Sequence, residues 1–346
     1  MKKYILFVFV SLLIVFPVKA EEILVTSSSS DNISIVSSTV NTTISVEEIV
    51  FEVKTDRELV EEPTIRVGLL KTFDVIKFKS EIDYEIYGGD EFIVLLPAGE
   101  IAKISYKKGL YYLTSESLAL ESKIYWRLKP TDPEGVFEIP GCKRTISGRK
   151  SVFCSYRGIF EYRYAPKSKM PYLINELPLE QYIKGITETD NNSAEGYVKA
   201  VLVAARSYAY KNISFDPPTE KRMFDVYATT QDQLYLGYIS ETSMPRVAQF
   251  AQETVGEMVT YKNNVVTTPY FSRSNGKTKT WKNAKRIADR PWMVSVECKY
   301  DKKMKQWGHG YGMSTRDALM RATKDKWGYI QLLGHYYSGT EVEKIY

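Results

Sequence analysis

Histidine and cysteine, the usual ligands of zinc, are scarce in this sequence. Only two histidines and three cysteines occur among the 346 residues. The cysteines, Cys142, Cys154 and Cys298, are spaced too widely for a thiolate zinc site, so we expect neither a metal nor another cofactor. Cys142 and Cys154 flank a polar stretch around Gly148 that could form a hairpin turn. A disulfide between them is geometrically feasible in an oxidising compartment, and the sequence leaves this pairing open.

Long apolar runs are lacking as well. The apolar run near the start, residues 4–18, holds 15 residues and includes Pro17, whereas a membrane-spanning helix needs roughly 20. The run follows Lys2 and Lys3 and ends at Val18-Lys19-Ala20, which is typical of a signal peptide cleaved after Ala20. We therefore expect an extracytoplasmic protein, secreted or associated with the cell envelope. An uncleaved N-terminal anchor is the alternative, and only then would the chain contact a membrane.

A strong charge bias is also missing. The formal net charge is +5, and no stripe of Lys and Arg with interleaved aromatic residues is present, so nucleic acid is not an expected partner. Tyrosine, by contrast, is abundant, with 26 copies. A ring with one polar end suits half-wet surfaces such as sugar-binding grooves. The surfaces of β-sheets would explain most of these tyrosines equally well.

The order of composition along the chain predicts four parts and an α+β fold class. Residues 1–20 form the signal peptide, and residues 21–62 form a flexible spacer because Ser, Thr and Asn dominate residues 26–46. Residues 63–165 contain short apolar runs separated by Gly, Asp and Pro, which predict a β-rich part. Its clearest predicted strands are residues 64–69, 92–96 and 159–164.

The last part, residues 166–346, mixes helix and strand signals. A short helix is expected after Pro178, with Leu179, Tyr182 and Ile183 on one face and Gly185 at its end. The other expected elements are a helix over residues 194–211, strand-like runs across residues 223–285 that include 257–261 and 265–266, and a helix from Ser314 to Trp327.

Charged side chains gather around the start of the 194–211 helix. Glu188 lies just before it, and Lys199 and Arg206 are two turns apart on one face. The small residues Ala204 and Ala205 indicate close approach by a neighbouring element, which would enclose Arg206 and require an acceptor for it. From spacing alone, an ordinary solvated face of Lys and Arg is favoured.

Two polar loops follow. Residues 268–278 combine hydroxyl groups with Tyr270 and Gly276, which suits sugar binding but is also ordinary turn composition. Residues 308–314 alternate three glycines around His309, so that the backbone can approach a ligand closely. No Gly-Lys-Ser/Thr ending is present, which argues against a nucleotide loop. The histidine could assist chemistry near neutral pH or hold a substrate hydroxyl.

These motifs together resemble the stage II sporulation protein D / amidase-enhancer (SpoIID/LytB) family. The resemblance rests on LPLEQYIKG at residues 177–185, then Glu188, KA at 199–200, VAARSYA at 203–209, GHGYGMS at 308–314 and HYYSGT at 335–340. It runs from about residue 63 to residue 346, and it implies a mixed α/β SpoIID-type domain with a substrate groove. Sporulation itself does not follow, because the same domain occurs in bacteria without spores.

The resemblance implies a bacterial lytic transglycosylase, an enzyme that cuts the MurNAc-β-1,4-GlcNAc bond of peptidoglycan and leaves a 1,6-anhydro end. Glu188 falls on the acid/base position, and Asp190, Glu195 and Asp225 are fallback carboxylates. The implied partners are peptidoglycan glycan strands and other cell-wall hydrolases. The residues that match family positions around the substrate are Lys199, Arg206, Gln233, Tyr270, Ser274 and His309.

The sequence also departs from the family pattern. The family usually has two more residues between Gly185 and the acid, and then Met-Pro and Trp-Pro where this chain has residues 189–192. A cysteine pair that binds metal in some relatives is missing from residues 224–238, so the resemblance implies no metal here. Two alternatives stay open: a non-catalytic wall-binding module that modifies the action of an amidase, and a structural surface protein with an adhesive β-rich half.

Overall fold

A computed structural model describes residues 59–146, 151–213, 223–284 and 289–346. These residues form strands in the first part and a mixture of helices and strands in the second, which confirms the α+β class. The predicted signal peptide and nearly all of the predicted spacer lie outside the described residues. Within the described ranges, no helix combines the length and the apolar character needed to cross a bilayer.

The larger sheet has seven strands in the order β13-β1-β12-β11-β8-β3-β4. Neighbours in it are antiparallel, except for β1 and β13, which are parallel. Its strands, in chain order, are β1 (Thr64–Lys71), β3 (Tyr84–Gly88), β4 (Glu91–Leu96), β8 (Trp126–Pro130), β11 (Ile159–Ala165), β12 (Met170–Pro178) and β13 (Val226–Tyr227). The strands predicted over residues 64–69, 92–96 and 159–164 are therefore confirmed.

The second sheet has six strands in the order β10-β9-β2-β5-β6-β7. Its strands are β2 (Ile76–Ser80), β5 (Ile101–Lys107), β6 (Leu110–Thr114), β7 (Ala119–Ser122), β9 (Val136–Glu138) and β10 (Ser155–Arg157). Strand β2 shows the expected alternation, since Ile76 and Phe78 are buried while Lys77 is exposed. One face of this sheet therefore belongs to a core.

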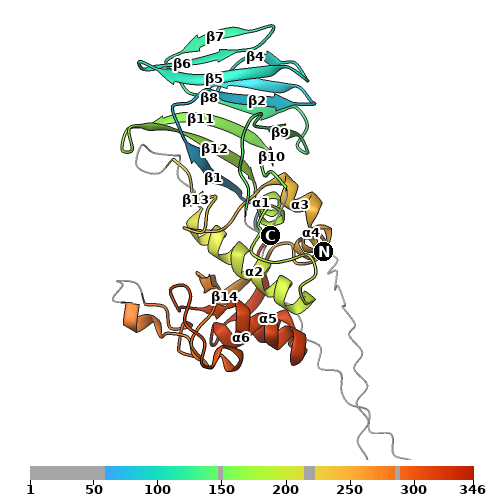
Figure 1. Cartoon of the computed structure of the whole chain (residues 1–346), viewed down its shortest axis with the longest axis vertical. Coiled ribbons are helices and arrows are strands. Elements are labelled where there is room, and N and C mark those ends of the chain that lie inside the picture. The colour runs from blue at the N-terminus through green and yellow to red at the C-terminus, as the bar shows by residue number, and fades with distance from the viewer. Residues whose placement is uncertain (1–58, 147–150, 214–222, 285–288) are drawn as a thin grey trace, which may run out of the picture. The chain divides into compact units, whose positions relative to one another are not determined.

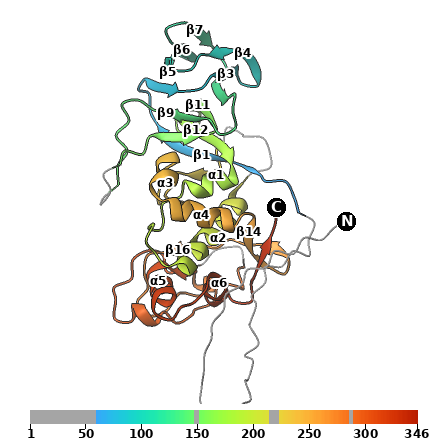
Figure 2. The same cartoon turned by 90° about the vertical axis from the view of Figure 1, so that its right-hand side faces the viewer.

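Aromatic side chains join the two sheets. Phe78 of β2 lies with its ring centroid 4.9 Å from that of Tyr84 on β3 and 5.3 Å from that of Phe160 on β11. Phe137 of β9 lies 5.5 Å from Phe160. Such offset and edge-on contacts add to the free energy gained by burying the rings. The strands of the two sheets accordingly lie together in Figures 1 and 2.

Strand β12 connects the two parts that the sequence predicts. It pairs with β1 on one side and with β11 on the other, so strands from both sides of the predicted boundary at residues 165 and 166 share one sheet. Helix α1 (Leu179–Lys184) follows β12 directly and contacts both β1 and β12 (Figure 2). The boundary itself stays a prediction.

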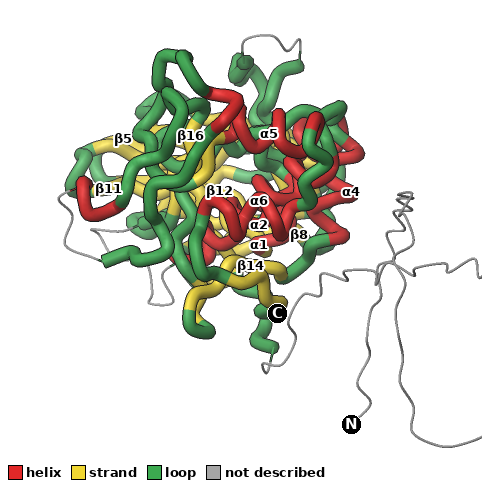
Figure 3. Tube along the Cα trace, turned by 90° about the horizontal axis from the view of Figure 1, so that it is seen from below, coloured by secondary structure: helices red, strands yellow, loops and turns green. Residues whose placement is uncertain are grey.

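The central helix of the second part is α2 (Glu195–Asn212), one residue from the predicted bounds. Eleven of its side chains are buried, because α1, α4, α5, α6 and β14 all contact it. Figure 3 shows α2 grouped with α5 and α6. The other helices are α3 (Tyr238–Ser243), α4 (Pro245–Glu253), α5 (Thr315–Lys324) and α6 (Tyr329–Tyr336).

Several helix predictions need correction. The strand-like interpretation of residues 223–285 is wrong where α3 and α4 lie. Pro245 opens α4 at a position where its missing N–H costs nothing. Helix α5 ends at Lys324 instead of Trp327, and Ser314 does not cap it with its side chain, because the hydroxyl of Ser314 donates to Asp301 instead.

Two small sheets complete the second part. Strand β14 (Glu257–Tyr261) pairs with β15 (Asn264–Val265) and β18 (Glu341–Lys344). Strand β16 (Tyr270–Phe271) pairs in parallel with β17 (Met313–Ser314), and this short ladder brings the two polar loops of the sequence together.

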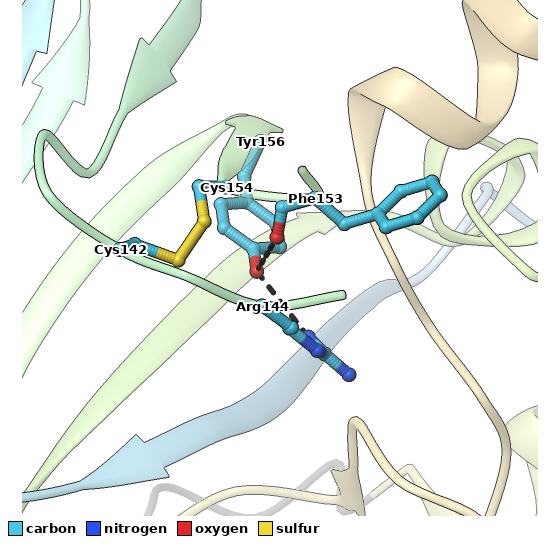
Figure 4. The surroundings of a disulfide bond; sticks show 5 residues. All are labelled: Cys142, Arg144, Phe153, Cys154 and Tyr156. Carbon is cyan, nitrogen blue, oxygen red and sulfur yellow. Dashed lines mark hydrogen bonds between the residues drawn. A yellow bond between two sulfur atoms is a disulfide. The ribbon is translucent and has the colours of Figure 1, made fainter. Parts of the chain in front are cut away.

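Cys142 and Cys154 form a disulfide, which answers the question that the sequence left open. Their Cα atoms are 6.0 Å apart, within the usual range of roughly 4.4–6.8 Å. Figure 4 shows Arg144 beside the bridge, donating to the Tyr156 hydroxyl, which in turn donates to the Phe153 carbonyl. Arg144 also donates to the carbonyl of Ala228, so the bridged segment is tied to the chain next to β13.

Candidate active site

Glu188 is held in a short antiparallel pairing between two loops. Ile186 forms a β-bridge with Tyr235, and the Thr187 N–H donates to the Leu234 carbonyl at 2.8 Å. The N–H of Leu234 returns a hydrogen bond to Oε1 of Glu188 at 2.7 Å. The Glu188 carboxyl group is therefore positioned by backbone, which an amino-acid substitution in a neighbouring side chain would not easily disturb.

The surroundings of Glu188 favour its protonated form. Its side chain is half-buried, and burial raises the pKa of Glu188 above its ordinary value, while the Leu234 N–H opposes this. No cation in the described part of the chain is among the groups that shift this pKa. The pKa of Glu188 is therefore shifted in the direction that a general acid requires.

Three tyrosines surround this carboxyl group. Burial raises the pKa values of Tyr182, Tyr197 and Tyr270, and the negative charge of Glu188 raises each of them further. The rings come from α1 and α2, on either side of Glu188 in the sequence, and from the distant strand β16, and all three are close enough for the charge of Glu188 to act on them. The phenol groups stay protonated and can donate hydrogen bonds at neutral pH.

Gln233 ties two of these tyrosines together. Its side chain is buried, and Oε1 accepts from the Tyr182 hydroxyl at 2.8 Å. Nε2 of Gln233 donates to the Tyr270 hydroxyl and to the Ala205 carbonyl, each at 3.2 Å. Since Leu234 is the next residue, the same segment fixes both the carboxyl group of Glu188 and the hydroxyl of Tyr270.

His309 joins the cluster through the backbone of Tyr270. Nδ1 of His309 accepts from the Tyr311 N–H at 3.0 Å, so Nε2 carries the proton and donates to the Tyr270 carbonyl at 3.1 Å. A backbone N–H can only donate, which is why the neutral tautomer with Nε2–H is the one present. His309 thus holds the glycine loop against β16.

The glycines of this loop are sterically required. Gly312 has φ +71°, and a Cβ there would lie 1.9 Å from the carbonyl oxygen of Pro269. Gly308 has φ +101°, and its added Cβ would come within 2.8 Å of Phe271. Glycine alone combines this backbone conformation with this closeness of approach.

We call Glu188, Gln233, Tyr270 and His309 the Glu188 cluster.

Ser274 lies elsewhere. It is buried, and both its N–H and its hydroxyl donate to Asp301, at 2.8 and 3.0 Å. Asp301 also accepts from the Ser314 hydroxyl at 2.6 Å and from Arg316 at 3.1 Å. Ser274 therefore fastens its loop to a buried aspartate and supports the position of β16 and β17.

Arg206 is fully buried and has no surface through which to touch a ligand. Its guanidinium donates to both oxygens of Glu180 at 2.8 Å, and also to the carbonyls of Glu257 and Ala251. The solvated face favoured by spacing is therefore wrong for Arg206. The enclosure indicated by the small residues around it is confirmed, with Glu180 as the acceptor.

Lys199 is occupied by carboxylates. Its Nζ lies 2.5 Å from Glu195 and 2.7 Å from Glu253, and its side chain is 13% exposed. Of the fallback carboxylates, Glu195 is therefore an ion-pair partner. Asp225 accepts from the Arg66 N–H at 2.9 Å beside β1, and Asp190 is exposed.

The structure thus brings together four of the seven predicted site residues and places Lys199, Arg206 and Ser274 in other contacts. Sequence reasoning missed the Leu234 N–H, which has no side-chain signal, and the tyrosines Tyr182 and Tyr197.

Two surface hollows lie in the described part of the chain, and neither is lined by a member of the Glu188 cluster. One hollow is lined by Tyr87, Gly89, Asp90, Arg127, Lys129 and Ile159. The other is lined by Thr280, Trp281, Lys282, Asp289, Arg290, Pro291, Met293 and Val294. The predicted groove stays a prediction.

Comparison with known proteins shows which family this chain is similar to. Residues 167–261 match the family model of SpoIID, described as stage II sporulation protein. This match covers α1, α2 and Glu188 and ends before the glycine loop. Over this stretch the chain is similar to the SpoIID family, as its motifs indicated.

Curated relatives agree. Stage II sporulation protein D of Bacillus subtilis (strain 168) is 26% identical over 177 residues, which is 46% of this chain and 49% of that protein. Its counterpart in Bacillus amyloliquefaciens is 25% identical over 178 residues, 46% of this chain and 48% of that protein. An uncharacterized protein of Brachyspira hyodysenteriae is 32% identical over 127 residues, 36% of this chain and 33% of its own length. The chain thus spans about half the length of the two sporulation proteins and about a third of the Brachyspira protein.

Proposed function

We propose that this protein is a peptidoglycan lytic transglycosylase that acts outside the cytoplasm, with Glu188 as its single acid/base. Similarity to the SpoIID family supports a role at the cell wall. The observation that carries the finer proposal is Glu188 itself: a half-buried carboxyl group with a raised pKa, fixed by the Leu234 N–H and surrounded by tyrosines. The extracytoplasmic location rests on the signal-peptide pattern of residues 1–20.

One carboxyl group suffices for this reaction. Protonated Glu188 gives its proton to the glycosidic oxygen as the bond from that oxygen to C1 of MurNAc breaks. The oxygen of the MurNAc 6-hydroxyl then bonds to C1 and loses its proton to the Glu188 carboxylate. The acid is restored, no water is consumed, and the product ends in a 1,6-anhydro ring. Hydrolytic glycosidases usually need a second carboxylate to activate water or attack C1.

The other members of the Glu188 cluster would position this acid. Gln233 holds the hydroxyl of Tyr270 near the carboxyl group, and His309 holds the backbone of β16 through the Tyr270 carbonyl. Because both ring nitrogens of His309 are engaged, we assign it no proton transfer. Its contribution is the placement of Tyr270, which can offer hydrogen bonds to a sugar or its N-acetyl group.

The test is mass spectrometry of purified glycan strands, with and without stem peptides, incubated with residues 21–346. Products ending in 1,6-anhydro-MurNAc are expected, and Glu188→Gln should lower their rate of formation by at least about 10²–10⁴-fold. Glu195→Gln is the matched control, because Glu195 is a nearby carboxylate in an exposed ion pair. Binding without cleavage by the unmodified protein would instead support a wall-binding module that modifies an amidase.

A further inference from the structure

Trp307 is the most exposed of the large apolar side chains in the described ranges, with 67% of its surface open to solvent. Single exposed apolar residues are common and need no explanation by themselves. Trp307 differs from the other exposed apolar residues in its position, because it directly precedes the glycine loop that carries His309. It therefore lies beside the Glu188 cluster without taking part in its hydrogen bonds.

The backbone at Trp307 is fixed. Its N–H donates to the Arg273 carbonyl at 2.9 Å, and its carbonyl accepts from the Arg273 N–H at 3.2 Å. Arg273 in turn lies two residues beyond β16. Trp307 and His309 are two residues apart, so their Cα atoms are separated by at most about 7.6 Å. The indole is thus presented from a backbone whose position relative to Tyr270 is set.

One cation lies over this indole, and three more lie on neighbouring segments of the chain. The guanidinium of Arg273 lies 5.9 Å from the centre of the Trp307 ring, and Nζ of Lys279 donates to the His309 carbonyl at 3.1 Å. Lys303 and Lys305 are exposed on the segment leading to Trp307. In the described part of the chain none of these four has a carboxylate partner, whereas neighbouring Lys302 pairs with Glu297. Their charge is available to an anionic ligand.

We propose that Trp307 is a sugar-stacking subsite, with Arg273 and Lys279 binding a carboxylate carried by the same glycan strand. This inference rests on the proposed function, since it adds a second binding point for the strand that Glu188 would cut. An exposed indole offers a flat apolar face to the C–H groups of a pyranose ring, and its N–H, which has no hydrogen-bond partner among the described residues, can bind a hydroxyl. A guanidinium suits a carboxylate in geometry and charge.

The carboxylate has two sources on peptidoglycan: the lactyl group of MurNAc once the peptide is removed, or the stem peptide itself. Three probes separate them in a Glu188→Gln background, where binding can be measured without turnover. These are neutral N-acetylglucosamine oligomers, denuded glycan strands, and strands that keep their stem peptides. Isothermal titration gives the Kd of each probe.

Trp307→Ala should weaken binding of all three probes by about 10-fold, which corresponds to about 1.4 kcal/mol. Trp307→Phe should recover most of the affinity, because it keeps an aromatic face. Arg273→Gln and Lys279→Gln should weaken only the strands that carry carboxylates, and less so at high salt. Loss with denuded strands would identify the lactyl group, and loss with peptide-bearing strands alone would identify the stem peptide.

Phe92→Ala is the matched control, since Phe92 is 52% exposed on β4, far along the chain from this surface. Unchanged affinity in Trp307→Ala, an equal loss in Phe92→Ala, or no binding of any probe would each overturn the inference. Failure of the proposed function looks different. If the unmodified protein binds strands through Trp307 but yields no 1,6-anhydro products, the subsite stands and the transglycosylase proposal falls.

Discussion

Glu180 and Glu188 lie eight residues apart, and their pKa values are shifted in opposite directions. Burial alone would raise the pKa of Glu180, but the charge and hydrogen bonds of Arg206 outweigh it and lower that pKa below its ordinary value. Glu188 is also withdrawn from water, and burial raises its pKa because no cation opposes it among the described residues. One short segment thus carries a compensated carboxylate that stabilises the fold and an uncompensated acid suited to chemistry.

The difference shows why charge near a site is a poor guide to its function. Lys199 and Arg206 match family positions and lie on the helix that follows Glu188, yet their charges are taken up by Glu195, Glu253 and Glu180. A cation close to Glu188 would have lowered its pKa, so that a smaller fraction of Glu188 would carry a proton near neutral pH. The buried pair of Arg206 with Glu180 and the partly exposed pairs of Lys199 therefore hold α2 in place without acting on Glu188.

The largest expected effect on the difference between the two carboxylates comes from replacing Arg206, the partner of Glu180. Arg206→Met leaves Glu180 buried without its partner, so we expect unfolding to require about 3–5 kcal/mol less free energy, measured by urea denaturation. Lys199→Met is the matched control on the same helix, and its partly exposed pairs should contribute about 0–1 kcal/mol. Equal losses in both variants would contradict the assignment of Arg206 to the core of the fold.

The two carboxylates should also drive stability in opposite directions with pH. Glu180 has a lowered pKa, so its contribution is present above the unfolded pKa and is lost as pH falls through the folded pKa. Glu188 has a raised pKa, so its contribution is present below the unfolded pKa and is lost as pH rises through the folded pKa. Each unit of pKa difference is worth about 1.4 kcal/mol.

Stability curves of Glu180→Gln and Glu188→Gln between pH 3 and pH 8, each compared with the unmodified protein, measure these two contributions separately. Glu188→Gln should cost little near neutral pH or even stabilise, whereas Glu180→Gln should destabilise most there. Activity should decline as pH rises through the raised pKa of Glu188, since the step needs its proton. Parallel curves for the two variants would show that both carboxylates have the same environment.

The smallest expected effect comes from Tyr270→Phe. It deletes the hydroxyl that accepts from Gln233, which should cost about 1 kcal/mol of stability and lower kcat by up to about 10-fold. Tyr261→Phe serves as a control on β14, outside the Glu188 cluster. A stability loss with unchanged kcat would make Tyr270 a purely structural neighbour of Glu188.

Much of the fold follows from sequence pattern. The strands 64–71 and 257–261 and the helix 195–212 were predictable because period-two alternation, β-branched runs and three-to-four spacing of apolar residues are local signals. Helix α3 was missed because Tyr, Ile, Ser and Thr, which have low helix propensity, dominate it. Helix α4 does carry a helix signal, since Val247, Phe250 and Ala251 lie on one face after Pro245, and the strand-like interpretation overlooked it. The end of α5 was misplaced because nothing in the segment 325–327 marks a stop as clearly as Gly328.

The site was only partly predictable. Glu188 could be identified from its motif, and an enclosed Arg206 from the small residues around it. The hydrogen bond from Leu234 to Glu188 could not, because a backbone N–H has no signature in sequence. The partner of Arg206 could not be chosen either, since Glu180, Glu195 and Glu253 are equally acidic and only tertiary packing decides which one is buried.

Strand β12 has a practical consequence for anyone who divides this protein. It lies between β1 and β11, and a fragment that starts at residue 166 would keep β12 while losing both neighbours. Nine residues of strand would then present unpaired N–H and C=O groups along two edges, a template for joining other chains. We therefore expect a fragment that starts at residue 166 to associate with other chains through β12, and measurements on it would report that association.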